Sequence, residues 1–303
     1  MPIARKYMGS QDGLAADIPV PFRSPAHKAA ALAVARSDLP LVYFVGDSHV
    51  SVFSGSDRIV AGFPAIADSS YPNARVCRLG ACLAATMHRL DTTEGGRAKA
   101  LAVLPLVEPG STVFLSFGEI DCRAHIPKRS GFSEEGLAGA VESALENFFS
   151  FVDDYRSLAG PRDIRIGLLS PPPTASFDNG PFQEALMRLL ERAVKHPFGR
   201  VSVRTIRSFL PKRPRMLFGN ALNATYAGHW MLRNTAARMF RDAFEDYCAR
   251  NGLAFVDMFG PFVEADGRSA ASWFMDEIHL SRHAIAAVSE DFARNGVPNF
   301  LRK

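Results

Sequence analysis

Three residues that are far apart in the sequence have the side chains needed to activate a hydroxyl group. Ser48 lies in a Gly-Asp-Ser-His run, whereas Asp276 and His279 lie three residues apart near the C-terminus. A serine hydroxyl is a weak nucleophile until a base takes its proton, and a third group best holds that base. On one loop, Asp276 can accept the Nδ1–H of His279 and leave Nε2 facing Ser48. The three residues therefore predict a catalytic serine triad.

These residues follow the ends of predicted secondary-structure elements. Five short apolar runs, rich in β-branched or aromatic residues, alternate with longer helical patterns, which predicts a parallel sheet covered on both faces. Ligands of such sheets bind outside the carboxyl ends of the strands. Ser48 follows the first predicted strand, and Gly80 and Gly118 follow the second and third. The predicted strands are 41–45, 75–79, 112–117, 164–169 and 253–258.

The helical patterns predict the rest of the architecture. We expect a helix over 26–36, one that Ser133 caps and Gly160 ends, one over 229–251 with Met231 facing inward, and one after Ser281. No Gly-x-Gly-x-x-Gly follows the first strand, so the flavodoxin-like strand order is favoured over the Rossmann order. The fold class predicted is α/β: a three-layer α/β/α sandwich with a parallel flavodoxin-like sheet of about five strands. The domain spans 39–303, after an N-terminal extension over 1–38 with one helix and with a basic insertion at about 197–228.

The order of the motifs resembles that of the SGNH, or GDSL-type, serine hydrolases. The blocks that carry this resemblance are Gly46-Asp47-Ser48 as the nucleophile block, Gly80 as the oxyanion glycine, Gly118-x-x-Asp121 as the third block, and Asp276-x-x-His279 as the catalytic block. They span about 39–287, which is most of the chain. One tripeptide is weak support, but four blocks in order are a strong signal. The resemblance implies acyl transfer on esters or amides without a metal or organic cofactor, often on acetylated sugars or lipids.

Two positions depart from the family pattern. Ile120 stands where the family usually has an asparagine that donates to the oxyanion, and an apolar side chain cannot donate. We therefore nominate Arg123 as the substitute donor, beside the backbone N–H groups of Ser48 and Gly80. His49 stands where the family commonly has leucine and adds a second imidazole near the nucleophile. Asp121 is expected to organise its loop through hydrogen bonds.

The sequence favours one function and leaves others open. The favoured function is a serine esterase, with a carbohydrate O-acetyl ester as the expected substrate. An O-acyltransferase on the same scaffold, or a decayed module that binds a glycan or lipid, is the alternative. Asp47-x-His49 also resembles the start of a metallophosphoesterase site, but no Gly-Asn-His-Asp/Glu or Gly-His-x-His motif accompanies it. Simpler structural roles compete as well, with Ser48 as a helix cap and His279 as a core or capping histidine.

Charge and composition limit the kinds of partner that the protein can have. The 303 residues are 47% hydrophobic and 22% charged, which is ordinary for a globular protein, and no apolar run approaches the ~18 residues of a membrane span. No secretory signal is visible, so a cytoplasmic location is the default, with four free cysteines. A small-molecule or glycan ester is the expected partner, with no nucleic acid. No Asp or Glu occurs between Glu191 and Asp242, and this stretch is either an anion-binding surface or a solvated loop. Its candidate anion-binding residues are Arg207, Lys212, Arg213 and Arg215.

Overall fold

The computed structural model describes residues 40–131, 133–175, 230–276 and 278–297. These residues form a six-stranded sheet with the strand order β2-β3-β1-β4-β5-β6, in which only the short β2 is antiparallel to its neighbour. Without β2, the order of the parallel strands is flavodoxin-like, as predicted. The bounds are β1 Val42–Gly46, β2 Ala67–Asp68, β3 Ala74–Arg78, β4 Thr112–Ser116, β5 Arg165–Leu169 and β6 Ala254–Val256.

All five predicted strands are present: four are shifted or shortened by one residue, and β6 is three residues shorter than predicted. The central strands β1 and β4 are buried at every position, because helices cover both faces of the sheet. Alternate residues of β1 enter different cores: Tyr43 and Val45 pack on one side, whereas Val42 and Phe44 pack on the other. The sheet therefore separates two apolar cores, and the three-layer prediction is confirmed.

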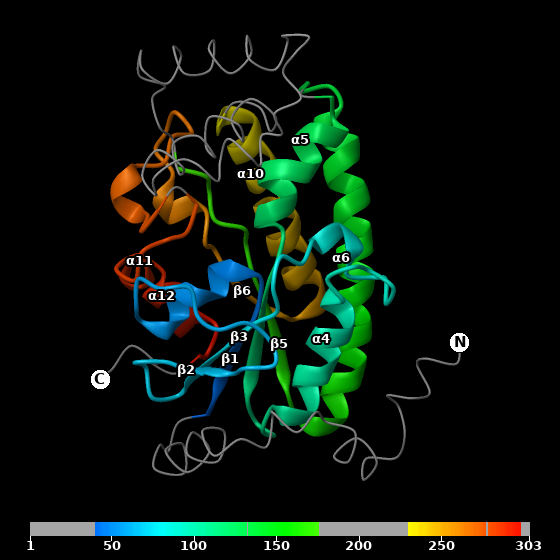
Figure 1. Ribbon diagram of the computed structural model, residues 1–303, viewed down its shortest axis with the longest axis vertical. Helices are drawn as coiled ribbons and strands as arrows, with labels where there is room; N and C mark the ends of the chain where they lie inside the picture. Colours follow the sequence, from blue (N-terminus) through cyan, green and yellow to red (C-terminus); the bar gives the residue numbers. More distant parts are fainter. Residues whose placement is uncertain (1–39, 132, 176–229, 277, 298–303) are drawn as a thin grey trace, which may run out of the picture.

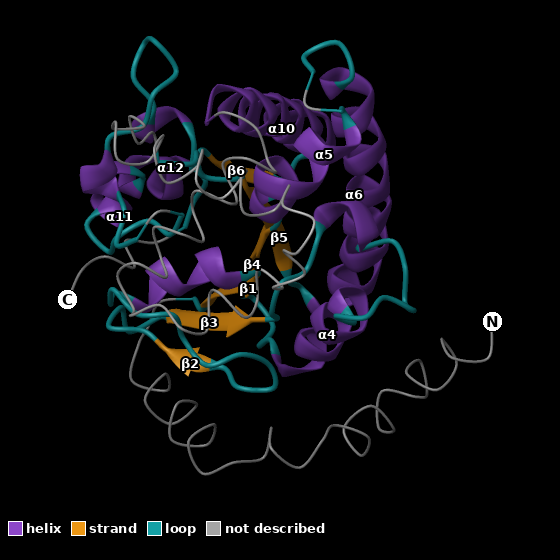
Figure 2. Cartoon of the chain, turned by 45° about the horizontal axis from the view of Figure 1, so that its top comes forward, coloured by secondary structure: helices purple, strands orange, loops and turns teal. Residues whose placement is uncertain are grey.

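The two faces of the sheet carry different helices (Figure 1). On one side lie α4 (Gly96–Val103), α6 (Leu137–Ala159) and α10 (Trp230–Asn251). Aromatic side chains of α6 and α10 fill much of the larger core. On the other side lie the 3-10 helix η2 (Ser48–Ser54) with α11 (Ala284–Ala287) and α12 (Ser289–Arg294). Figure 2 shows the same division with the sheet between the two groups. The remaining short helices are η3 Ala84–Thr86, η4 Leu104–Leu106, η5 Asp121–His125, α5 Ile126–Arg129, η6 Gly160–Arg162, η7 Gly260–Phe262 and η8 Ala271–Trp273.

Two details of the helix predictions are wrong. α6 begins at Leu137, and Ser133 lies before it, where its Oγ accepts a hydrogen bond from the N–H of Gly136. Met231 of α10 is 54% exposed, whereas Leu232 packs into the core. In the first turn of α10, Leu232 and not Met231 therefore faces the core, whereas Phe240 and Tyr247 are buried as predicted. The helix ends as expected at Gly252, whose φ of 63° suits a residue without Cβ.

Some expectations fall outside the described residues, namely the extension over 1–38 with its helix and the insertion at about 197–228. All four cysteines are buried and unbonded, as expected. Within the described ranges, no helix is long and apolar enough to cross a membrane.

Candidate active site

The first strand ends in a tight connection that presents Ser48 at the edge of the sheet. Gly46 lies against β4 so closely that a Cβ there would come within 2.0 Å of the Ser116 carbonyl oxygen. Only glycine fits this position. Asp47 then caps η2, with its Oδ1 accepting the backbone N–H of His49 at 2.9 Å. Ser48 is thereby placed, half-buried, at the first position of η2.

The loop that carries the other two residues of the predicted triad is fixed by its own aspartate. Phe274 and Leu280 pair as an isolated antiparallel bridge at the base of this loop. Asp276 Oδ1 accepts the backbone N–H groups of Ile278 at 2.9 Å and His279 at 2.8 Å. This double acceptance folds the chain back, so that the Asp276 carboxylate and the His279 ring lie side by side.

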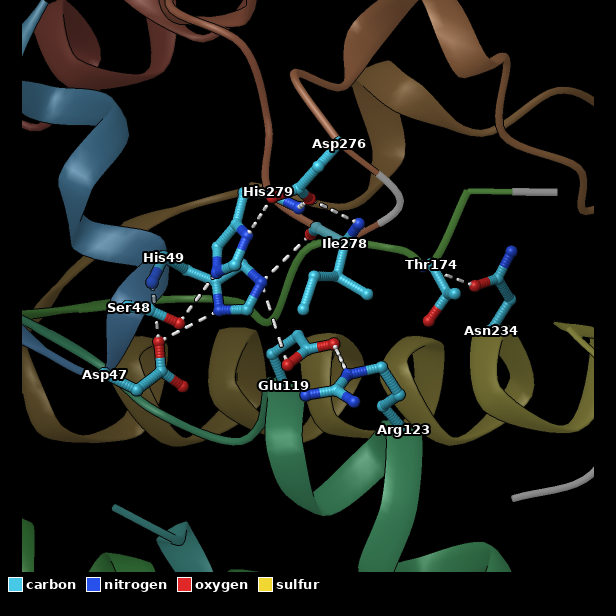
Figure 3. Close-up of polar contacts among 10 residues, drawn as sticks. All are labelled: Asp47, Ser48, His49, Glu119, Arg123, Thr174, Asn234, Asp276, Ile278 and His279. Carbon is cyan, nitrogen blue, oxygen red and sulfur yellow. Dashed lines mark hydrogen bonds and ion pairs between the residues drawn. The ribbon is translucent and has the colours of Figure 1, made fainter. Parts of the chain in front are cut away.

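The three predicted residues meet at the carboxyl end of β1 (Figure 3). His279 Nε2 lies 2.8 Å from Ser48 Oγ, and His279 Nδ1 lies 2.7 Å from Asp276 Oδ2. Burial would raise the pKa of Asp276, but the hydrogen bond and charge of His279 and the two backbone donors lower it to about 2. Asp276 is therefore ionised at neutral pH and accepts Nδ1–H, which leaves the Nε2 lone pair for the Ser48 hydroxyl.

The two backbone N–H groups that the motif resemblance assigns to an oxyanion belong to Ser48 and Gly80. Within the described residues, neither the N–H of Ser48 nor that of Gly80 has a hydrogen-bond partner. Gly80 follows β3 with a φ of 114°, a conformation that other residues rarely adopt. The carbonyl of the same peptide group belongs to Leu79 and accepts a hydrogen bond from Lys99 Nζ of α4 at 3.0 Å. Lys99 was not singled out from the sequence, because no motif marks it.

The third block supports this region through the backbone. Asp121 Oδ2 accepts the N–H of Ala84 at 2.7 Å and its Oδ1 accepts that of Ala85 at 3.2 Å, which anchors η3 shortly after Gly80. Burial raises the pKa of Asp121 to about 7, although the two backbone donors oppose the rise. Gly118 has a φ of 107°, and a Cβ there would come within 2.9 Å of Phe240. Asp121 was expected to organise its own loop after β4, whereas its carboxylate bonds η3 in the segment after β3.

Arg123 does not take the position that the sequence analysis assigned to it. Its Nε donates to Glu119 Oε1 at 2.7 Å, and Figure 3 shows the guanidinium directed to this carboxylate. Glu119 is only 3% exposed at its side chain, so a cationic partner offsets the cost of burying its charge. The nomination of Arg123 as an oxyanion donor is corrected to this ion pair. Ile120 precedes η5 and supplies no donor.

A second imidazole lies directly beside the first. His49 is buried, its ring stacks on that of His279 with 4.7 Å between centroids, and its Nδ1 lies 3.0 Å from Asp47 Oδ1. Asp47 and His49 are thus bonded to each other, in contrast to the metallophosphoesterase reading in which both bind a metal. In the described part of the chain, no three His, Cys, Asp or Glu side chains are grouped so that they could hold a metal ion.

Sequence reasoning missed further residues that shape the site. Glu119 follows β4, and this strand-end position was the available signal for it. Asn234 of α10 accepts the N–H of Thr174 at 2.9 Å and donates to the Gly267 carbonyl at 3.0 Å, which holds the segment after β5. No sequence signal marks such a bridge. The predicted anion-binding residues Arg207, Lys212, Arg213 and Arg215 lie outside the described residues.

No protein-family model and no curated protein matches this sequence. Solved structures resemble the chain at low identity. An acetylxylan esterase from Geobacillus stearothermophilus is 12% identical, with 87% of this chain and 97% of that chain covered and a TM-score of 0.44. Est24, a carbohydrate acetylesterase from Sinorhizobium meliloti, is 14% identical, with 85% and 97% covered and a TM-score of 0.36. An aryl esterase from M. smegmatis is 12% identical, with 85% and 99% covered and a TM-score of 0.35.

Proposed function

We propose that this protein is an SGNH-type serine esterase in which Ser48 is the nucleophile, His279 the general base and Asp276 the residue that orients it. The observation that carries the proposal is the unbroken hydrogen-bonded row from Asp276 Oδ2 through the His279 ring to Ser48 Oγ, at 2.7 Å and 2.8 Å. Catalytic serines are recognised by this geometry rather than by their positions in the sequence. The four motif blocks support the same assignment independently.

The proposed reaction begins when Ser48 Oγ attacks the carbonyl carbon of an ester and its proton passes to His279 Nε2. The developing oxyanion accepts hydrogen bonds from the N–H groups of Ser48 and Gly80. The carbon–oxygen bond to the leaving alcohol then breaks, and that alcohol takes the proton from His279. Water, activated in turn by His279, attacks the acyl-enzyme, releases a carboxylic acid and restores the Ser48 hydroxyl.

A carbohydrate O-acetyl ester is the proposed substrate. A small acyl group suits a nucleophile that lies half-buried at a strand end, and acetylated sugars are among the substrates that the motif resemblance implies. Acetate release from acetylated xylo-oligosaccharides, compared with p-nitrophenyl acetate and p-nitrophenyl octanoate, tests this substrate class. Faster turnover of octanoate than of acetate would contradict it. Transfer of the acetyl group to an added sugar instead of water would identify the transacylase alternative.

Labelling by a fluorophosphonate followed by peptide mapping tests the nucleophile before any substrate is known. The expected result is one modified peptide that contains Ser48, because only an activated serine attacks the phosphorus. No labelling at Ser48 in folded protein would contradict the mechanism and favour a binding module. Activity that falls with EDTA, measured on a phosphoester, would instead favour the metallophosphoesterase.

The acid-free stretch between Glu191 and Asp242 supports a preference for anionic esters, through Arg207, Lys212, Arg213 and Arg215. Replacing Arg213 and Arg215 by glutamine is expected to raise KM for an anionic ester but not for a neutral one. Added salt is expected to reduce the difference, because mobile ions screen such attraction. Equal effects on both esters would show that these four basic residues belong to a solvated loop with no role in binding the substrate.

A further inference from the structure

His49 meets only hydrogen-bond acceptors. Its Nδ1 lies 3.0 Å from Asp47 Oδ1, and its Nε2 lies 3.0 Å from the carbonyl oxygen of Ile278. A carbonyl oxygen carries no hydrogen, so Nε2 must donate to Ile278. An ionised carboxylate is likewise an acceptor, so Nδ1 must donate to Asp47. A neutral imidazole has one N–H and cannot satisfy both partners, whereas an imidazolium can.

The charges around His49 also require a cation. Asp47 and Glu119 both face the ring, and the distance from His49 Nε2 to Glu119 Oε2 is 3.7 Å. The side chains of these two carboxylates are 1% and 3% exposed, and one oxygen of each, Asp47 Oδ2 and Glu119 Oε2, has no hydrogen-bond partner within the described residues. Arg123 balances one of the two charges through Glu119 Oε1. The buried Arg233 of α10 also acts on the Glu119 charge. Asp47 forms its ion pair with His49, and a charged His49 supplies a cation in direct contact with this buried carboxylate.

The pKa of His49 is shifted in the direction that these surrounding charges favour. Burial lowers the pKa of His49 and Arg123 opposes its charge, but the carboxylates of Glu119 and Asp47 outweigh both and raise the pKa to about 9. The remaining titratable group in contact with the ring is His279, which is itself paired with Asp276.

The position of His49 links this cation to the proposed catalytic base. The carbonyl that it bonds belongs to the peptide group between Ile278 and His279. Asp276 holds the N–H groups of these same two residues from the other side of the loop. The ring of His49 also lies under that of His279, with an interplanar angle of 28°. His279 is therefore held at its backbone by Asp276 and by His49, and at its ring face by His49.

We propose that His49 is a positioning residue of the esterase: held as a permanent imidazolium, it clamps the Ile278 carbonyl, fixes His279 against Ser48, and opposes protonation of His279. This inference rests on the proposed function. A cation under the ring keeps the base unprotonated between turnovers and favours return of the proton to the leaving alcohol. No bond to substrate is required of His49, so its effect is exerted entirely through His279.

The ionisation state of His49 can be observed directly by ¹⁵N NMR of the imidazole groups in the full chain. Spectra of the wild type and of His49→Gln assign the signals, and Ser48→Ala shows whether they depend on the nucleophile. At pH 7 both ring nitrogens of His49 are expected to be protonated, in the wild type and in Ser48→Ala alike. A bare Nδ1 at this pH would mean that Asp47 carries the proton, and it would overturn the proposal.

Kinetics of His49→Gln test the effect on the base. Glutamine keeps an N–H for Ile278 but removes the charge, with His88→Gln as the control because His88 is exposed. We expect kcat to fall about ten- to a hundredfold with KM within about twofold, because a misplaced base mainly affects the transition state. The low-pH limb of kcat/KM is expected to move to higher pH, since protonation of the base is no longer opposed. His88→Gln is expected to keep the wild-type profile.

Folded His49→Gln with unchanged kcat and an unchanged pH profile would overturn the positioning role. Should this variant not fold, sequential assignment of the wild-type protein identifies the His49 signals, and the NMR measurement still decides whether His49 is an imidazolium. Failure of the fluorophosphonate to label Ser48 contradicts the proposed esterase, but it leaves the NMR result on His49 unchanged. The two proposals can therefore fail separately.

Discussion

Two histidine–aspartate pairs lie face to face in this protein, and they differ in what the far ring nitrogen meets. In the outer pair, Asp276 and His279, Nε2 faces the Ser48 hydroxyl, which can donate a proton. In the inner pair, Asp47 and His49, Nε2 faces a carbonyl, which can only accept. The same two side chains therefore give a neutral base in one place and a fixed cation in the other.

Burial separates the pairs further. The side chains of His279 and Asp276 are 13% and 29% exposed, whereas those of His49 and Asp47 are 5% and 1% exposed. A proton-transfer group needs access to substrate and water, and a structural charge needs fixed partners instead. The hydrogen-bond partners of a histidine beside a catalytic serine therefore determine whether it acts as a base or as a fixed charge.

The largest expected effect comes from breaking the outer pair at its hydroxyl. Ser48→Ala is expected to lower kcat on p-nitrophenyl acetate by about 10⁴-fold or more, because no other group can form the acyl-enzyme. Ser157→Ala is the matched control, since Ser157 is exposed on α6 and bonds only a backbone carbonyl among the described residues. Retained turnover in pure, folded Ser48→Ala would rule out Ser48 as the nucleophile.

The next effect comes from removing the charge of the outer pair. Asp276→Asn keeps an oxygen for the two backbone N–H groups but can present an amide N–H to His279, which disfavours the tautomer with Nδ1–H. We expect kcat to fall about 10³- to 10⁴-fold at constant KM, by analogy with other serine triads. Asp246→Asn on the exposed face of α10 serves as the control. A silent Asp276→Asn beside an inactive His279→Ala would remove the carboxylate from the mechanism.

The charge of the inner pair is expected to affect the pH dependence of the free energy of unfolding. The pKa of His49 in the folded protein, about 9, lies above the unfolded value of about 6.5. Its contribution to stability is therefore full below pH 6.5 and is lost as pH rises through 9. The loss is of order 3 kcal/mol in the free energy of unfolding. Urea unfolding of wild type and His49→Gln between pH 6 and about 10 measures it as the difference between the two curves.

The difference between the unfolding free energies of the wild type and His49→Gln removes the contribution of titrating groups that both proteins share. Such groups include the buried cysteines, whose pKa is also raised by burial. The gap between the wild type and His49→Gln is expected to narrow as pH rises. A gap that stays constant with pH would show that His49 carries no charge in the folded state.

The outer pair was readable from the sequence, and most of the inner pair's environment was not. Strand positions were predictable because buried parallel strands are continuous apolar runs, and the residues after them mark the site. The two-residue β2 is too short to show a periodic pattern. The exposure of Met231 was not predictable, because Met231 and Leu232 are both apolar and only the folded chain decides which of them faces the core. Arg123 was assigned to the oxyanion and not to Glu119, because the spacing shows that Glu119 is one helical turn away but not that its carboxylate is buried. Contacts such as Lys99 with Leu79 exist only in the folded chain.

The smallest predicted effect concerns the oxyanion site that both pairs serve. Ile120 supplies no donor, so two backbone N–H groups must hold the developing charge, and one of them belongs to Gly80. Lys99 Nζ donates to the carbonyl of that same peptide group. An ammonium on the oxygen polarises the peptide and makes its N–H a stronger donor, because hydrogen bonds in a chain reinforce one another.

Lys99→Met is therefore expected to lower kcat about ten- to thirtyfold with little change in KM, since the strengthened donor acts on charge that exists only in the transition state. Lys99→Arg, which keeps a cationic donor, is expected to restore most of the loss. Lys128→Met is the control, because Lys128 is exposed on α5. If Lys99→Met raised KM and left kcat unchanged, Lys99 would instead bind substrate, and the Gly80 N–H would act without its help.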